Sequence, residues 1–252
     1  MRLDNFLVKN KYFDSRTKAM QSIKRGEIYL NGKLVTKSAL EVNDNVDNNV
    51  QIVCETQYVS LGGFKMEKAL RDFNFNVNEL ICADIGCSTG GFTDCLLKNG
   101  AKKIYAIDIN DNLLHPKLQN DDKVKFILKN ARNLSKDDID DKIDLIVADL
   151  SFISVNLVLE TISNLLDDNK HLLILIKPQF ETGEKKKYKN GIIRDNKLHK
   201  KICVNAIEEA KKYSLFIKNF TIAPESKEKN KEFLMLFEKN GIQTFDLENM
   251  NI

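Results

Sequence analysis

The sequence is poor in the residues that build metal sites and disulfide frameworks. Its three histidines stand far apart, at positions 115, 171 and 199, and its five cysteines are scattered without a C-x-x-C pair. This pattern favours neither a zinc site nor a disulfide scaffold. It predicts a reduced protein without a bound metal.

Long hydrophobic runs and an apolar leader are also missing. The longest aliphatic run, Leu172–Ile176, is far shorter than the roughly 20 residues that cross a bilayer. The N-terminal stretch MRLDNFLVKN has no signal core. We therefore expect a cytoplasmic protein without a membrane partner. A pore-forming protein would need an amphipathic or transmembrane segment, and the sequence offers none.

A strong overall charge is absent as well, since the formal net charge is only +3. The distribution of charge is more informative than its sum. Residues 1–37 contain nine basic and three acidic side chains, an excess that could meet a phosphate backbone. A solvated lysine-rich face is the alternative interpretation.

Residues 1–53 have the pattern of a small α+β domain. Apolar residues at helical spacing predict a helix from Leu3, and Ser15 is placed to cap a second helix. Asn31-Gly32 stands between alternating apolar residues. This dipeptide predicts a hairpin, because both central positions of a type I′ turn require positive φ.

After a predicted linker at residues 54–60, the pattern changes. Across residues 61–252, short apolar runs alternate with amphipathic stretches, as in strands buried on both faces of a mostly parallel sheet. The connection between the last two runs is too short for a right-handed crossover, so we expect these two strands to pair antiparallel. The polar tail after Asn240 is expected to be frayed. The predicted strands are Leu80–Ile85, Ile104–Ile107, Val124–Leu128, Ile143–Ala148, Leu172–Ile176, Leu215–Ile222 and Phe233–Phe237, with helices at Ser154–Leu166 and Asn196–Tyr213.

The stretch ADIGCSTGGFTD begins at residue 83 and follows the first strand of this α/β domain. Ligands collect at the carboxyl ends of strands in such sheets, so Gly86 and Gly90-Gly91 are placed to bring a ligand against backbone. Cys87-Ser88 stands where the dinucleotide fingerprint requires its second glycine, and the Lys-Ser/Thr pair of a phosphate loop is absent. A neutral cofactor tail fits better. A turn that serves only helix–sheet packing is the alternative.

An acidic residue ends the next predicted strand. Asp108 lies about 20 residues after the loop, where a carboxylate can accept hydrogen bonds from both ribose hydroxyls of an adenosine. Nicotinamide cofactors and S-adenosylmethionine would both use it. The glycine spacing disfavours a nicotinamide oxidoreductase.

Further motifs carry a family resemblance. YVSLGGFKMEKAL, KNARNL, DLIVADLSF, LLILIKPQFETG and GIIRD resemble the TlyA (hemolysin A-like) family of rRNA 2′-O-methyltransferases, and the N-terminal region resembles its S4-like RNA-binding domain. The resemblance implies a Rossmann-like class I methyltransferase of the FtsJ/RrmJ type, with one antiparallel strand near the sheet edge and S-adenosylmethionine as cofactor. It implies cofactor binding by Asp84, Gly86, Ser88, Gly90, Gly91, Asp108 and Asn130, and RNA binding by Arg2, Arg16, Lys18, Lys24 and Arg25.

The resemblance also implies a catalytic tetrad of Lys65, Asp149, Lys177 and Glu232. Asp149 and Lys177 each follow an apolar run, and Pro178 favours extended backbone at the residue before it. A ribose hydroxyl is a poor nucleophile, so the protein must align it with the methyl donor and receive its proton. Whether Lys177 accepts that proton or orients the hydroxyl stays open.

Other methyl-transfer chemistries are disfavoured by the residues after Asp149. Methylation of a cytosine carbon needs a cysteine nucleophile, and amino-directed enzymes carry a Pro-Pro-aromatic motif where this chain has Leu150-Ser151-Phe152. The family resemblance implies cytidine ribose as the target, in 23S rRNA and, as a second target, in 16S rRNA. An S4-domain protein with an inactive core would bind RNA or ribosomes without modifying them. The complete tetrad disfavours it.

One position departs from the family pattern. Leu61 stands where the family commonly has arginine in Ser-Arg-Gly-Gly. A basic contact made by that arginine is therefore missing here or supplied by another residue.

Overall fold

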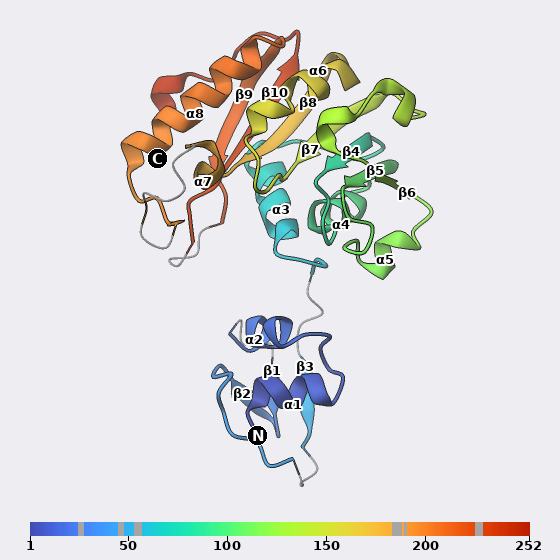
Figure 1. Ribbon diagram of the computed structural model, residues 1–252, viewed down its shortest axis with the longest axis vertical. Coiled ribbons are helices and arrows are strands. Elements are labelled where there is room, and N and C mark those ends of the chain that lie inside the picture. Colours follow the sequence, from blue (N-terminus) through green and yellow to red (C-terminus); the bar gives the residue numbers. More distant parts are fainter. Residues whose placement is uncertain (25–27, 45–47, 53–56, 183–187, 189–190, 225–228) are drawn as a thin grey trace. The chain divides into compact units, whose positions relative to one another are not determined.

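A computed structural model describes residues 1–24, 28–44, 48–52, 57–182, 188, 191–224 and 229–252 (Figure 1). The chain divides into two compact units, Met1–Gln57 and Tyr58–Ile252. Tyr58 is 3% exposed and belongs to the core of the second unit, although it falls within the predicted linker. The predicted bounds of domains and linker stay a prediction.

The described residues of the first unit form two helices and a three-stranded antiparallel sheet. The predicted turn is confirmed: Asn31 and Gly32 have φ of 51° and 76° and join strands paired through Leu30 and Lys33. Ser15 Oγ accepts a hydrogen bond from the Lys18 N–H at 3.3 Å, as its predicted capping role requires. The elements are α1 (Leu3–Lys9), α2 (Arg16–Lys24), β1 (Ile28–Leu30), β2 (Lys33–Val35) and β3 (Val50–Ile52), with sheet order β2-β1-β3.

The second unit is built on a seven-stranded sheet of order β6-β5-β4-β7-β8-β10-β9 (Figure 1). The neighbours from β6 to β8 pair in parallel, whereas β10 is antiparallel to both β8 and β9. The expected antiparallel strand next to the sheet edge is therefore confirmed. The strands are β4 (Ile81–Ile85), β5 (Lys103–Asp108), β6 (Val124–Leu128), β7 (Ile143–Ala148), β8 (Leu166–Ile176), β9 (Leu215–Ile222) and β10 (Phe233–Lys239).

Helices cover both faces of this sheet. On one face, α6 (Leu159–Leu165) and α8 (Asn196–Lys211) pack against a core that includes Tyr105 and Phe237. On the other, α3 (Gly62–Asp72) and α4 (Gly91–Lys98) pack around a second buried cluster. The shorter α5 (Pro116–Gln119) and α7 (Pro178–Glu181) follow strand ends. The result is the three-layer α/β arrangement that the buried runs predict.

Two sequence-based expectations are wrong. The strand predicted at Leu172–Ile176 begins earlier, at Leu166, because Leu166 already pairs with Ile143 and His171 with Leu145; the polar residues 167–170 form an irregularity between these two pairs. The tail after Asn240 is not frayed. Met250 is 3% exposed, and neighbouring apolar side chains of the tail pack against the sheet core because burial removes their surface from water.

Candidate active site

The carboxyl edge of the sheet gathers residues from distant parts of the sequence. Parallel β4, β5, β7 and β8 end at this edge, so Asp108, Asp149 and Lys177 lie at or directly after strand ends. Glu232 precedes β10, which runs the opposite way and begins at the same edge. The pairing of Phe233 with Ile176 makes Glu232 and Lys177 neighbours across the sheet.

A cavity of about 510 Å³ opens at this edge. Its volume lies within the roughly 300–1,000 Å³ that is usual for small-molecule sites. Four of the seven residues predicted to bind the cofactor line it: Gly86, Ser88, Asp108 and Asn130. Two loops contribute most of the remaining wall, residues 129–132 and 149–153.

The glycine loop fixes the Asp108 carboxylate on the cavity wall. Ser88 adopts a left-handed conformation, with φ of 49°, and its N–H donates to Asp108 Oδ2 at 2.9 Å. The Asn110 N–H donates to the other carboxylate oxygen at 3.1 Å. Each oxygen keeps a further lone pair, so the carboxylate can still accept hydrogen bonds from ligand hydroxyls.

Gly86 permits a close approach of the 149–150 segment, and its predicted role in cofactor binding stays a prediction. Its φ is +81°, and a Cβ there would lie 3.0 Å from Leu150 Cδ2 and 3.1 Å from the Asp149 carbonyl oxygen. Asn130 lies opposite in the cavity lining, and its side-chain oxygen accepts from the Arg132 N–H at 3.0 Å. Both positions are therefore held by local backbone geometry.

Asp84 lies behind the cavity wall and is 1% exposed. Its Oδ2 accepts from the Thr93 N–H at 3.0 Å and from the Thr93 hydroxyl at 2.6 Å, while Oδ1 has no hydrogen-bond partner among the described residues. Burial raises the pKa of Asp84 to about 7, and the negative charges of Asp149 and Asp108 act in the same direction. A positively charged ligand in the cavity would favour the ionised form of this buried carboxyl.

Gly90 and Gly91 lie outside the described cavity lining and face neighbouring helices. Gly90 has φ of +89°, and a Cβ there would lie 2.2 Å from Leu118 Cδ1 of α5. A Cβ on Gly91 would lie 2.3 Å from Ser60 Oγ and 2.9 Å from the Gly63 nitrogen. In this structure both glycines permit helix packing, and their predicted role in cofactor binding stays a prediction.

The four residues of the predicted tetrad form two ion pairs. Lys177 Nζ pairs with Asp149, and Lys65 Nζ lies 2.5 Å from Glu232 Oε2. All four side chains are largely shielded from solvent, with Lys177 the most deeply buried. Lys177 has φ of −112°, the extended conformation predicted from Pro178. Two lysines and two carboxylates thus meet beside the cavity. Among the described residues, no group of acidic, histidine or cysteine side chains could hold a metal ion.

Sequence reasoning gave no role to Ser151, although it quoted the motif that contains it. Lys177 Nζ donates to Ser151 Oγ at 2.9 Å, and Ser151 also lines the cavity. Lys177 is therefore held by two groups of the same loop, the Asp149 carboxylate and the Ser151 hydroxyl.

Glu181 also went unnoticed, and it anchors the far end of that loop. Its carboxylate accepts from the Ser154 hydroxyl at 2.6 Å and from the Val155 N–H at 3.0 Å, and burial raises its pKa. Between the anchors, Phe152 has φ of +69° and is 79% exposed, with its ring 5.4 Å from that of Phe180. A positive φ is strained for an aromatic residue, so the anchors hold the loop in an uncommon conformation.

The predicted RNA-binding residues of the first unit are divided. Arg2 and Arg16 both donate to the buried carboxylate of Asp4, at 2.9–3.1 Å and 3.0 Å. Lys18 pairs with Asp14 at 2.8 Å. These three cations are partly exposed and oriented by acidic partners. The side chain of Lys24 and all of Arg25 lie outside the described residues.

Comparison with known proteins decides the family. The model of the FtsJ-like methyltransferases matches residues 58–239, and that of the S4 domain matches residues 1–47. The chain belongs to the FtsJ-like methyltransferase family. This assignment confirms the predicted methyltransferase fold, the N-terminal S4 domain and S-adenosylmethionine as the cofactor. The Asp108 carboxylate fits the ribose of this group, and the orphaned buried oxygen of Asp84 fits its positive charge.

Its relatives include proteins named TlyA and hemolysin A, which confirms the predicted resemblance. Hemolysin A of Brachyspira hyodysenteriae is 43% identical, over 89% of this chain and 93% of its own length. The 23S rRNA (cytidine-2′-O)-methyltransferase TlyA of Campylobacter jejuni is 33% identical, over 95% of this chain and 100% of its own. A solved structure from Streptococcus thermophilus that carries a hemolysin name is 35% identical, with a TM-score of 0.75, covering 96% of this chain and 90% of that chain. Within the described residues, no helix is long and apolar enough to span a membrane.

Proposed function

We propose that this methyltransferase transfers a methyl group to the ribose 2′-hydroxyl of a cytidine in ribosomal RNA. One observation carries the proposal: Lys177 is held by Asp149 and Ser151, two residues that line the cofactor cavity. A hydroxyl brought to Lys177 is therefore next to the cofactor. TlyA relatives that act on cytidine in 23S rRNA, or in 16S and 23S rRNA, support the substrate class.

The chain's own groups are suited to align a hydroxyl and receive its proton: the Lys177 ammonium donates to the ribose oxygen, and once it has released a proton to solvent, its free amine accepts the hydroxyl proton. When bound, S-adenosylmethionine supplies the electrophilic methyl group. Lys177 Nζ donates to Ser151 and forms an ion pair with Asp149, which leaves one side of the ammonium for the ribose oxygen. The Lys65–Glu232 pair lies across the same edge and adds a second cation next to the hydroxyl. Alignment and proton removal are the tasks that a weak nucleophile requires.

The S4 domain supplies affinity for RNA in this proposal. Its partly exposed Arg2, Arg16 and Lys18 present positive charge to a phosphate backbone. We propose the large ribosomal subunit as the main partner and the cytoplasm, where ribosomes are found, as the location.

Lys177→Ala tests the proposal most directly. Methyl transfer from radiolabelled S-adenosylmethionine to large ribosomal subunits should fall by about 100-fold or more, the usual scale for a positioned acid–base group. Cofactor binding should survive, because Lys177 is not part of the glycine loop. Lys177→Arg should not restore activity, since a guanidinium stays protonated and has a different shape.

Several outcomes would count against the proposal. Near-parental turnover of the alanine variant would remove Lys177 from the site, and an inactive parental protein would favour an RNA-binding protein without methyl transfer. Mapping ribose methylation on both rRNAs, in cells with and without the gene, identifies the modified nucleotide and subunit.

A further inference from the structure

One amide side chain joins two distant segments near the tetrad. Asn230 Nδ2 donates to the Gly191 carbonyl at 2.9 Å, and Asn230 Oδ1 accepts from the Ile193 N–H at 2.8 Å. Ile193 is 2% exposed, so its segment is also anchored in the protein interior. Residues 191–193 and 229–232 therefore form one fixed piece of surface.

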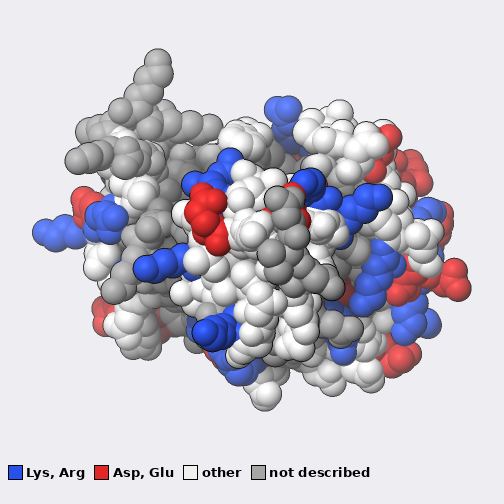
Figure 2. Space-filling model, turned by 90° about the horizontal axis from the view of Figure 1, so that it is seen from below, with Lys and Arg blue, Asp and Glu red and all other residues white. Residues whose placement is uncertain are grey.

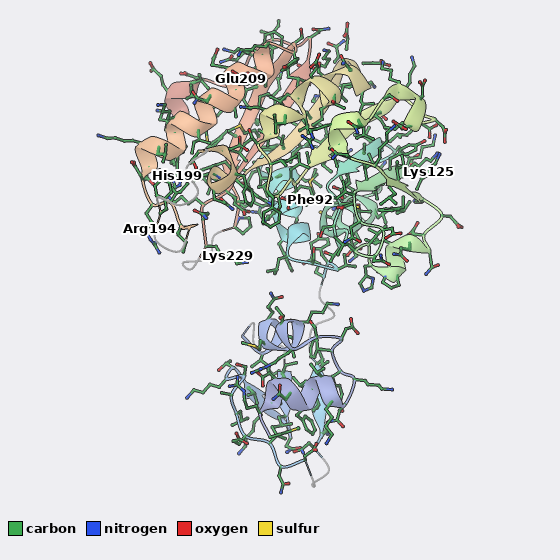
Figure 3. All side chains as sticks on the ribbon, viewed as in Figure 1. Phe92, Lys125, Arg194, His199, Glu209 and Lys229 are labelled. Carbon is green, nitrogen blue, oxygen red and sulfur yellow. The ribbon has the colours of Figure 1, made fainter. Side chains whose placement is uncertain are left out.

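Two exposed cations project from this piece. Arg194 follows the anchored Ile193 and precedes Asp195, whose carboxylate caps α8 by accepting from two backbone N–H groups at 2.9 and 3.2 Å. Lys229 directly precedes Asn230. Figure 3 draws the Arg194 and Lys229 side chains at the same end of the second unit. Within the described ranges, neither side chain forms an ion pair.

Lys229 lies close to Glu232 along the chain, and the hydrogen bonds of Asn230 join the Arg194 segment to the same place. Glu232 lies two residues after Asn230, a distance of at most about 7 Å along extended chain, and it pairs with Lys65. A nucleotide whose ribose hydroxyl lies at Lys177 must extend its neighbouring phosphodiesters over the adjoining surface. Figure 2 shows basic and acidic side chains interspersed on the visible face. Net charge therefore does not locate an RNA-binding surface here, whereas cations without an ion-pair partner at a fixed position do.

We propose that Arg194 and Lys229 form a phosphate subsite for the RNA backbone next to the methylated ribose, and that Asn230 positions it. This inference rests on the proposed function. A guanidinium can bind a phosphate through two parallel hydrogen bonds, and a lysine adds a mobile point charge. Because anchored backbone holds Arg194 on both sides, only its side chain has to be ordered when it binds.

The test compares the full-length parent with Arg194→Ala, Lys229→Ala and the double variant, using methyl transfer to large ribosomal subunits. In the double variant, KM for the subunit should rise about tenfold, while kcat and the affinity for S-adenosylmethionine stay at parental values. The slope of log binding constant against log salt should become shallower by about one unit for each phosphate that the variant no longer neutralises.

A control for the single variants removes one positive charge at the opposite end of the sheet. Lys123 is exposed and precedes β6, so Lys123→Ala should leave KM and the salt slope unchanged. Asn230→Ala keeps every charge and should still raise KM, because the segment that carries Arg194 loses its link. Thermal unfolding of each variant shows whether it is folded.

The outcomes separate this inference from the proposed function. If the parent methylates the subunit and the double variant behaves like Lys123→Ala, the phosphate subsite is refuted and the proposed function stands. If the parent transfers no methyl group to RNA, the proposed function fails. An unchanged salt slope for subunit binding would then refute the subsite as well.

Discussion

Replacing Ser151 with alanine should lower methyl transfer without weakening cofactor binding. Lys177 Nζ donates to Ser151 Oγ at 2.9 Å and forms an ion pair with Asp149, and these two groups occupy two of the three sides of the ammonium. Only the third remains for a substrate oxygen. Without Ser151 the ammonium can rotate about its terminal bond and point a donor at solvent rather than at the ribose.

A hydrogen bond from a charged donor contributes about 1.5–3 kcal/mol. Ser151 is exposed, so water can replace part of this interaction, and the lower end of the range applies. Since about 1.4 kcal/mol corresponds to one factor of ten in rate, Ser151→Ala should reduce kcat about tenfold. Ser151→Thr keeps the hydroxyl and should retain most of the parental rate.

The assay is methyl transfer to large ribosomal subunits at saturating S-adenosylmethionine, with cofactor affinity measured separately by calorimetry. Asn156→Ala is a suitable control, because Asn156 is exposed nearby and has no contact with Lys177 among those described. A parental kcat in Ser151→Ala would refute the idea that this hydroxyl orients Lys177. A loss of cofactor affinity equal to the loss of rate would show that Ser151 acts through the cavity wall instead.

Two further predictions concern stability. Gly90→Ala should lower the free energy of unfolding of the second unit by about 2–4 kcal/mol, because Gly90 combines positive φ with a 2.2 Å approach of the new Cβ to Leu118. Gly191→Ala should lower it by only about 1–2 kcal/mol, because Gly191 has positive φ but open space around it. Equal losses for the two variants in urea unfolding would contradict the packing argument. In the first unit, the hydrogen bond from Arg2 holds the pKa of Asp4 below 3.8, with Arg16 acting the same way. The carboxylate should therefore stabilise the unit above about pH 4, and this contribution should disappear as pH falls through the lower folded pKa. Asp4→Asn should lower the free energy of unfolding of this unit by about 1.5–3 kcal/mol near neutral pH. Hydrogen exchange of α1 and α2, measured against pH, should then show a weaker loss of protection at acid pH. A pH dependence equal to that of the parent would refute this linkage.

Local sequence signals predicted most of the fold. Apolar runs found the buried strands because strands covered on both faces have apolar side chains throughout. Asn31-Gly32 predicted its turn because few residues accept two consecutive positive φ values. The start of β8 was not predicted because its first residues are mostly polar and partly exposed, so they do not form an apolar run. The tail after Asn240 was misjudged because its apolar residues are too widely spaced to show a period.

The site was only partly predictable. The family motifs named Lys65, Asp149, Lys177 and Glu232, and the structure brings them together in two pairs. Contacts such as that between Ser154 and Glu181 join residues 27 positions apart. The periodicity of apolar residues cannot predict such long-range polar contacts. Glycines also limit what the sequence can predict about the site. A ligand and a neighbouring helix that approach the backbone closely both require a residue without a side chain. Only the fold shows which neighbour is present.

The direction of β10 has a consequence for how the protein is made. The bond between Lys65 and Glu232 joins residues 167 positions apart, and Glu232 reaches the site only when β10 inserts between β8 and β9. The strands that line the cavity, from β4 to β7, all precede residue 149. During synthesis, a nascent chain can therefore build its cavity wall well before its fourth tetrad residue has left the ribosome. Such late, long-range pairing is slow, because the entropy of closing a long loop must be lost first. A chain interrupted before residue 232 would retain the cavity-lining segments and lack Glu232.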